Sequence, residues 1–482
     1  MKKAAIAGIA IGILAIGGIG GNLVVSQMLE NRIRESINKP AAGLQVQCDD
    51  VRVSLLQRTI SISNLRLSGD RGEQSCRELV LRPTFSLMLA GGVPSLHFLL
   101  PTSGPVVLGD ATARDITLGL APSGQSATDE VTLKTLTISN AYLDADLFAE
   151  LLENRGAPAL PDFVGKAGAG RIEISQLRLR STMSTPISME ALTLDDSVVG
   201  TQAALMEAKQ FIIDDAEQRI SGSLRLTDIA VPATLARKMF APTISADDIE
   251  QTLFTTNPPL YRTMTLENGA FVSNGTTIAC RRLFLDWRSN NPLHTISRVE
   301  QLEIPIHSAP GLQRLRINSE GEHVQQGELF RDKGTIDIAD AGRLEIDLEH
   351  NIDLAGHSLE DDNLQSLLGG QFEKAYLRYE DKGGIALLLT ILIDNKETIS
   401  QMVDMLAVQI PAALPGESNK QLAEALRTTL LTPGTLELRL REDKGIRVID
   451  LMDTDRLGRW IEAKAVPGKE NVKNQLLRKF EQ

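Results

Sequence analysis

Ile60-Ser61-Ile62-Ser63-Asn64-Leu65-Arg66-Leu67 is the stretch of sequence that decides the fold of this chain. Apolar and polar residues alternate along it, which is the pattern of a β-strand with one buried and one solvated face. Ile172-Glu173-Ile174-Ser175-Gln176-Leu177-Arg178-Leu179 repeats the same pattern farther along the chain. We therefore predict a long antiparallel β-sheet with an apolar face and a polar face.

The alternation slips by one residue in both stretches, because Ile62 and Leu65 are three residues apart and so are Ile174 and Leu177. A slip of one residue would turn the rest of the strand to the wrong face of the sheet. A β-bulge would absorb the extra residue. We predict such bulges at 63–64 and 175–176.

Alternating segments recur along most of the chain, separated by polar, Gly-rich or Pro-rich stretches. The predicted strands are 46–56, 59–67, 76–81, 115–120, 131–143, 171–180, 187–194, 220–226, 263–272, 278–287, 299–306, 312–317, 335–338, 344–354 and 435–440. Helical spacing predicts helices at 144–153, 249–254, 397–410, 419–431, 453–463 and 471–480. Pro411 and Pro415 are expected to break the chain between two of these helices. The apolar run 385–393 is too short to span a membrane and is expected to be buried.

Composition limits the class of function. The chain has 482 residues, with 50 basic and 62 acidic residues and a net charge of −12. An acidic balance of this kind argues against a nucleic-acid partner, because phosphate binding requires clustered Lys and Arg. Aromatic residues make up only 4% of the chain, so we expect a core built from Leu, Ile, Val and Ala.

The N-terminus has the composition of a membrane anchor. Residues 4–25 carry no charge and, as a helix, would extend about 33 Å, which is enough to cross the hydrocarbon layer. Lys2 and Lys3 would keep the N-terminus in the cytoplasm and place the rest of the chain outside. The apolar residues of the predicted anchor are Ile6, Ile9, Ile11, Ile13, Leu14, Ile16, Ile19 and Leu23.

A cleaved signal peptide is the alternative for this segment. An uncleaved anchor is favoured because no Ala-x-Ala site follows and because helical spacing continues until Pro40. Gly8 and Gly12, like Gly17 and Gly21, have the four-residue spacing that permits close helix pairing, so a homodimer through the anchor is an open alternative.

Three cysteines, Cys48, Cys76 and Cys280, are too few for a disulfide scaffold and too far apart in sequence for a zinc site. Cys48 and Cys76 lie in neighbouring predicted strands, where they could form a disulfide in an oxidising compartment. Two buried thiols are the equal alternative. Cys280 is expected in the core.

No motif for catalysis or for cofactor binding occurs in the chain. The six histidines form no His-Glu-x-x-His pattern, and there is neither a nucleophile elbow nor a phosphate loop. Adjacent acids such as Asp214-Asp215 are typical of solvated turns. We predict no catalytic residue, metal ligand or cofactor, and no enzymatic activity.

The segment that follows the predicted anchor resembles the AsmA-like family of Gram-negative envelope proteins. The resemblance rests on Val46-x-x-Asp49-Asp50-Val51-x-Val53-Ser54-Leu55-Leu56, on the strand at 60–67, and on Cys76-x-x-Leu79-x-Leu81-x-Pro83-x-Phe85-Ser86-Leu87-Met88. The YdgA-like periplasmic proteins share the same outline. The resemblance implies a curled sheet with an apolar inner face and a role in lipid transfer or outer-membrane assembly.

Together these features predict a mainly β protein with added helices. It would consist of a cytoplasmic tip and anchor (1–25), a connecting amphipathic helix (26–43), a β-rich extracytoplasmic domain (44–363) and an α/β C-terminal region (364–482). The predicted location is the bacterial inner membrane, with a single pass and with most of the chain in the periplasm. The apolar sheet face fits either an open groove for phospholipid or the core of a closed sandwich.

The predicted function is envelope maintenance with lipid handling in an apolar β groove. The alternative is a periplasmic scaffold that binds an envelope protein through strand edges or the C-terminal helices. A hydrolase would require a cleft with convergent titratable groups.

Overall fold

The structure is a computed structural model and describes residues 44–481, except 55–56, 70–71, 85, 88–102, 120–129, 153–159, 181–185, 216–217, 240–259, 291, 307–313, 352–369, 393–395, 442–444, 448–449 and 452. The described part of the chain is mainly β, with long antiparallel strands and added helices, as the sequence predicts. Contacts divide it into two compact units, Met1–Met264 and Thr265–Gln482. The anchor residues from Ile6 to Leu23, the connecting helix at 26–43 and the predicted helix at 249–254 lie outside the described residues.

The first unit is a meander in which each strand pairs with the next one along the chain. Its edge is a broken strand, because β1 and β2 both pair with β3, and the order then runs from β3 to β10. The elements are β1 (Leu44–Gln47), β2 (Asp50–Ser54), β3 (Thr59–Gly69), β4 (Gly72–Pro83), β5 (Pro105–Gly119), β6 (Glu130–Asp144), α4 (Ala145–Leu152), η2 (Leu160–Phe163), β7 (Ala167–Arg180), β8 (Ile187–Val198), β9 (Gln202–Asp214), β10 (Gln218–Ala230) and α5 (Ala233–Met239). β11 (Thr263–Ser273) spans the boundary between the units.

A line of left-handed residues crosses this sheet where the apolar pattern slips. Asn64, Asp115, Gln176 and Gln210 all have positive φ, between 47° and 50°. They lie on every second strand, β3, β5, β7 and β9, at one level of the register. Asn and Asp tolerate the left-handed region better than most residues, and all four side chains are exposed on the polar face.

The predicted bulges are wrong in one respect. The irregularity is present, but the strands on both sides stay in register: Ser63 pairs with Glu78 and Leu65 pairs with Cys76, with no shift between them. The reason is that the neighbouring strand β4 slips by the same amount, because Cys76 and Leu79 lie on the same apolar side although they are three residues apart. A two-against-one bulge forms where β9, slipped at Gln210, meets β10, in which Gly222 and Leu224 are only two residues apart.

The second unit continues as a meander and ends in helices. The order of pairing is β12–β13–β14–β15–β16–β17–β18–β20, and β19 also pairs with β17. The elements are β12 (Thr276–Asn290), β13 (Leu293–Pro305), β14 (Arg314–Gln326), β15 (Leu329–Ile338), β16 (Gly342–Asn351), β17 (Gln371–Asp381), α8 (Gly384–Leu392), α9 (Lys396–Ala413), η3 (Glu417–Asn419), α10 (Lys420–Leu431), β18 (Thr435–Leu440), β19 (Ile446–Arg447), α11 (Leu457–Trp460), β20 (Ile461–Val466) and α12 (Val472–Glu481).

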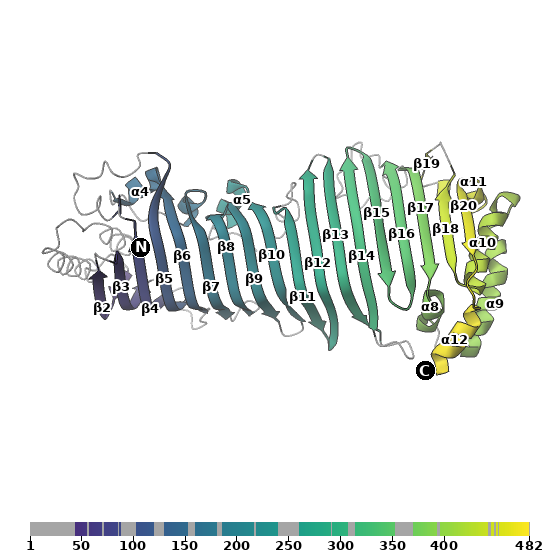
Figure 1. Cartoon of the computed structure of the whole chain (residues 1–482), viewed down its shortest axis with the longest axis horizontal. Coiled ribbons are helices and arrows are strands. Elements are labelled where there is room, and N and C mark those ends of the chain that lie inside the picture. Colours follow the sequence, from purple (N-terminus) through teal and green to yellow (C-terminus); the bar gives the residue numbers. More distant parts are fainter. Residues whose placement is uncertain are drawn as a thin grey trace. The chain divides into compact units, whose positions relative to one another are not determined.

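Helices cover one end of this second sheet (Figure 1). α8, α9 and α12 enclose a core that contains Ala386, Leu389 and Val403, with exposed fractions of 0%, 5% and 0%. α10 packs on β18 and β20 through a second core that includes Leu422 and Ala463. The side chains of these two cores are therefore buried between elements in the ordinary way.

The predicted C-terminal elements are mostly confirmed, with two corrections. Helices are present close to 397–410, 419–431 and 471–480, and a strand is present at 435–440. Pro411 lies inside the last turn of α9 instead of ending that helix before it. The helix predicted at 453–463 is wrong, because only Leu457–Trp460 is helical and the chain then forms strand β20. Across the described part of the chain, no helix combines the length and the apolar character that crossing a bilayer requires.

Candidate binding site on the sheet of the second unit

One face of strands β12 to β17 is aliphatic and only half-buried. Strand register places its side chains in rows; Leu285 lies level with Ser297, for example, and Ile346 lies level with Leu377. The members, which together we call the apolar face, are Leu283, Leu285, Trp287, Val299, Ile336, Leu344, Ile346, Leu348 and Leu377, and all of them are half-buried. The described residues of this unit form one sheet only, so no second sheet among them covers this face.

The opposite face of the same strands carries paired charges. Arg331 contacts Glu349 at 3.1 Å, and Asp347 accepts from Lys374 at 2.5 Å. These pairs join neighbouring strands, and at such exposed positions each pair contributes little stability. The two faces therefore differ in kind, and the polar face is the one suited to water.

A hollow interrupts the apolar face where two glycines meet. Gly321 of β14 pairs with Gly334 of β15, so two adjacent positions carry no side chain. The hollow has a volume of about 290 Å³, and Ile336 and Ile346 form part of its wall. A Cβ at Gly334 would lie 2.9 Å from the backbone oxygen of Glu320, so the close approach of the two strands requires glycine there.

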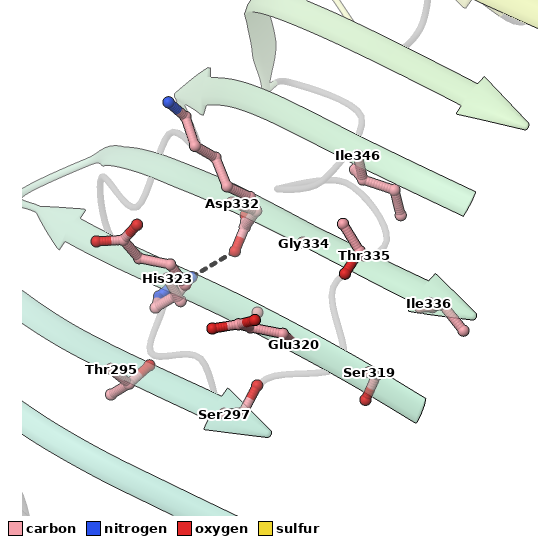
Figure 2. Close-up of a pocket in the computed structure, with 13 residues that line it drawn as sticks. Thr295, Ser297, Ser319, Glu320, His323, Asp332, Gly334, Thr335, Ile336 and Ile346 are labelled. Atoms are coloured by element: carbon pink, nitrogen blue, oxygen red, sulfur yellow. Dashed lines mark hydrogen bonds and ion pairs between the residues drawn. The ribbon is translucent and has the colours of Figure 1, made fainter. Parts of the chain in front are cut away.

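Polar side chains gather at the edge of this hollow. Thr295 and Ser297 of β13 and Ser319 of β14 bring three hydroxyl groups to it. Ser297 is the closest to the glycines, because its Oγ would lie 3.0 Å from a Cβ at Gly321. Figure 2 shows these hydroxyl-bearing side chains on neighbouring strands beside the glycine position.

A carboxylate held between two imidazoles completes the site. Asp332 accepts from His323 Nδ1 at 2.6 Å with one oxygen, and its other oxygen lies 3.3 Å from His350 Nε2 (Figure 2 shows the His323 contact). The His350 ring stacks on Phe330, with 5.2 Å between ring centroids, and meets the edge of Phe372 at 5.7 Å. Aromatic contacts and the shared carboxylate thus fix the orientation of both imidazoles.

This arrangement determines the hydrogen-bonding character of His323. If Nδ1 carries the proton donated to Asp332, then Nε2 of the neutral ring is left as an acceptor. Hydroxyl groups, an imidazole acceptor and aliphatic walls form a site that can hold the polar end of an amphiphile. Within the described part of the chain, no group of three or more His, Cys, Asp or Glu side chains is placed to hold a metal ion.

Sequence reasoning missed this cluster, although one signal was available. Gln326 pairs with Leu329 across a two-residue turn at Gly327 and Glu328, where Gly327 has a positive φ. Counting outward from that turn brings His323 opposite Asp332. A Gly-containing two-residue turn is a strong hairpin signal, so this pairing could have been predicted.

Of the two alternatives that the sequence leaves open for Cys48 and Cys76, the disulfide does not form. Cys48 and Cys76, both within the described residues, are not joined by a disulfide. Cys48 lies in the break between β1 and β2, on one side of β3, and Cys76 lies on β4, on the other side; two strand spacings amount to about 9–10 Å, which exceeds the reach of a disulfide. Burial raises the pKa of the Cys76 thiol, and that thiol donates to the Glu78 carbonyl at 3.2 Å. The same cause raises the pKa of Cys280.

Comparison with known proteins adds one match. A protein-family model described as "Uncharacterized protein" matches residues 335–463, from within β15 to within β20. No curated protein matches the sequence at a significant level. The matched segment includes β16, β17 and the helices from α8 to α11, and its description carries no function.

Proposed function

We propose that this protein handles lipid in a bacterial envelope, held at the inner membrane by residues 1–25 and with the β-rich part in the periplasm. The half-buried aliphatic face of β12 to β17 is the observation that carries the proposal. The side chains of this face are not fully removed from water. Covering them with a ligand would therefore contribute further hydrophobic free energy. The likeness of the N-terminal segment to AsmA-like proteins supports the same function.

The energetics are sufficient for acyl chains. Each methylene buried on the apolar face contributes about 0.8 kcal/mol, so ten methylenes contribute about 8 kcal/mol before the cost of ordering the ligand. Leu285 and Ile346 lie in one row of the apolar face and Leu348 lies in the adjoining row, so all three are placed for such contacts. In this proposal the sheet shelters acyl chains as an open groove instead of closing as a sandwich.

Site-specific photo-crosslinking tests the proposal in the full-length chain in Gram-negative cells. The photoreactive residue p-benzoylphenylalanine would replace Leu348 on the apolar face or, as the matched control, Glu349 on the polar face of the same strand. We expect lipid adducts, detected by mass spectrometry, at position 348 and not at 349. Absence of adducts at 348, or equal yields at the two positions, would contradict a lipid-handling role.

A protein-binding scaffold is the second candidate, and one observation favours it. Helix α9 exposes 48% of Met405 and 75% of Val408, and Leu388 of α8 is 58% exposed. Exposed apolar side chains on helices are common at protein interfaces. The same crosslinker at Val408 would yield a protein adduct of defined mass if the scaffold function holds, and position 348 would then yield no lipid.

A further inference from the structure

We infer that the hollow over Gly321 and Gly334 binds the uncharged, hydroxyl-bearing head group of an amphiphile, such as the glycerol end of a monoacylglycerol. This inference rests on the proposed function and names the chemistry of the ligand. It draws on three features of the hollow: its size, its hydrogen-bonding groups and its charge.

The size of the hollow suits a head group and not a whole lipid. Its volume of about 290 Å³ lies at the lower limit of small-molecule pockets, which are roughly 300–1,000 Å³. Acyl chains would have to leave it and lie on the surrounding aliphatic side chains. Ile336 and Ile346 line the hollow itself, so apolar contacts for an acyl chain begin directly beside its hydrogen-bonding groups.

The hydrogen-bonding groups of the hollow match those of a polyol. Thr295, Ser297 and Ser319 each present a hydroxyl, which both donates and accepts. In the neutral tautomer whose Nδ1–H donates to Asp332, His323 presents Nε2 as an acceptor. A ligand that satisfies this set must donate to the imidazole and exchange hydrogen bonds with hydroxyls, as the hydroxyl groups of glycerol or of a sugar do.

The charge of the hollow disfavours an ionic head group. Asp332 is the charged side chain in its wall, because Glu320, Glu322 and Lys333 alternate with the two glycines and carry their ion pairs on the opposite face. A phosphate or carboxylate would therefore meet the negative charge of Asp332 and no Lys or Arg side chain. An ammonium group would have to share the oxygens of Asp332 with the two imidazoles that they already contact, at 2.6 and 3.3 Å. An uncharged head group avoids both conflicts.

Two photoreactive probes with the same acyl chain test the inference on the full-length protein in phosphatidylcholine nanodiscs. One probe is a diazirine-labelled monoacylglycerol, and the other is the matching fatty acid. Gly321→Val fills the hollow with a side chain suited to a strand, and Ser297→Leu fills it without changing a glycine. Ser188→Leu, on β8 in the first unit, is the control.

We expect the monoacylglycerol to label the wild type, and we expect both filling variants to lower that labelling about tenfold, which corresponds to the loss of one or two hydrogen bonds. Fatty-acid labelling should stay within about twofold in every variant, as should monoacylglycerol labelling of Ser188→Leu. Equal labelling of wild type and filling variants by the monoacylglycerol would overturn the inference and leave acyl binding intact. The inference would also be overturned if the filling variants lowered labelling by the fatty acid and not labelling by the monoacylglycerol. If neither probe labels the wild type, the proposed function falls together with the inference.

Discussion

Aliphatic side chains of the second unit differ in burial between its helical end and its sheet. At its helical end, Leu389 and Val403 are 5% and 0% exposed in a core enclosed by α8, α9 and α12. On β12 to β17, leucines and isoleucines of the same size stay half-buried. In the helical core, burial of the apolar surface stabilises the folded chain. On β12 to β17, part of the apolar surface stays in contact with water and is available for further contacts. An apolar side chain is thus evidence for a core only when a covering element is present.

The largest expected effect comes from making the same substitution, Leu→Ala, once in each of these two regions. Leu389→Ala should lower the free energy of unfolding by about 2–4 kcal/mol, because it leaves a cavity in an enclosed core. Leu348→Ala, made on the open face, should cost only about 1 kcal/mol, because water already reaches the site. Chemical denaturation of both variants measures the difference. Equal losses would mean that the β12–β17 face is as closed as the helical core.

A second effect tests how the helical end satisfies its buried polar groups. Asn419 is fully buried, and its amide donates to the carbonyls of Pro415 and Thr454 at 2.6 and 2.8 Å. Its Oδ1 accepts from the Gly458 backbone N–H. Asn419→Ala leaves three backbone groups without this partner and should cost about 2–3 kcal/mol of unfolding free energy.

The control for that variant is Asn318→Ala on the open sheet. The Asn318 side chain accepts one backbone hydrogen bond, from Gln301, at an exposed position. Water can replace that partner, so the loss should be about 1 kcal/mol or less. A loss at Asn318 as large as that at Asn419 would remove the distinction between the enclosed and the open region.

A third effect concerns the junction between the sheet and α8. The Tyr379 hydroxyl donates to Asp381 at 2.7 Å, and Asp381 also accepts from the backbone N–H of Gly383 and of Ile385 at the start of that helix. Burial, assisted by the Asp381 carboxylate, raises the pKa of Tyr379 well above its usual value. Tyr379→Phe should lower the free energy of unfolding by about 1 kcal/mol at neutral pH.

The raised pKa of Tyr379 also gives a pH dependence with a definite sign. The stability that this tyrosine contributes is fully present below the unfolded-state pKa of about 10, and it is lost as the pH rises above that value, where only the unfolded chain gives up the proton. We expect the unfolding free energy of the wild type to fall more steeply above about pH 10 than that of Tyr379→Phe. Parallel pH profiles would show that the raised pKa of Tyr379 is not linked to folding.

Sequence patterning could predict the strands but not what their faces meet. Alternation at 60–67 and 172–179 is a local property, and the strands it predicts are present. The matched slip in neighbouring strands depends on register between strands, which a single strand does not encode. Likewise, 453–463 has helical spacing, but residues 461–466 pair with β18 and that pairing overrides the local preference. The hollow depends on two glycines that meet only after β14 and β15 have paired.

The smallest effect is kinetic and compares two thiols on the two sheets. Burial raises the pKa of both Cys76 and Cys280, and Cys76 is the more deeply buried of the two. At pH 8 a raised pKa leaves less thiolate, so alkylation by iodoacetamide should be slower in the folded protein than in urea at both positions. We expect Cys76 to be the slower of the two by a fewfold, because Sγ of Cys280 lies on the half-buried apolar side of β12 and β13. Peptide mass spectrometry over time measures both rates in one sample. Faster alkylation at Cys76 would show that the first sheet opens more readily there than the half-buried face of the second.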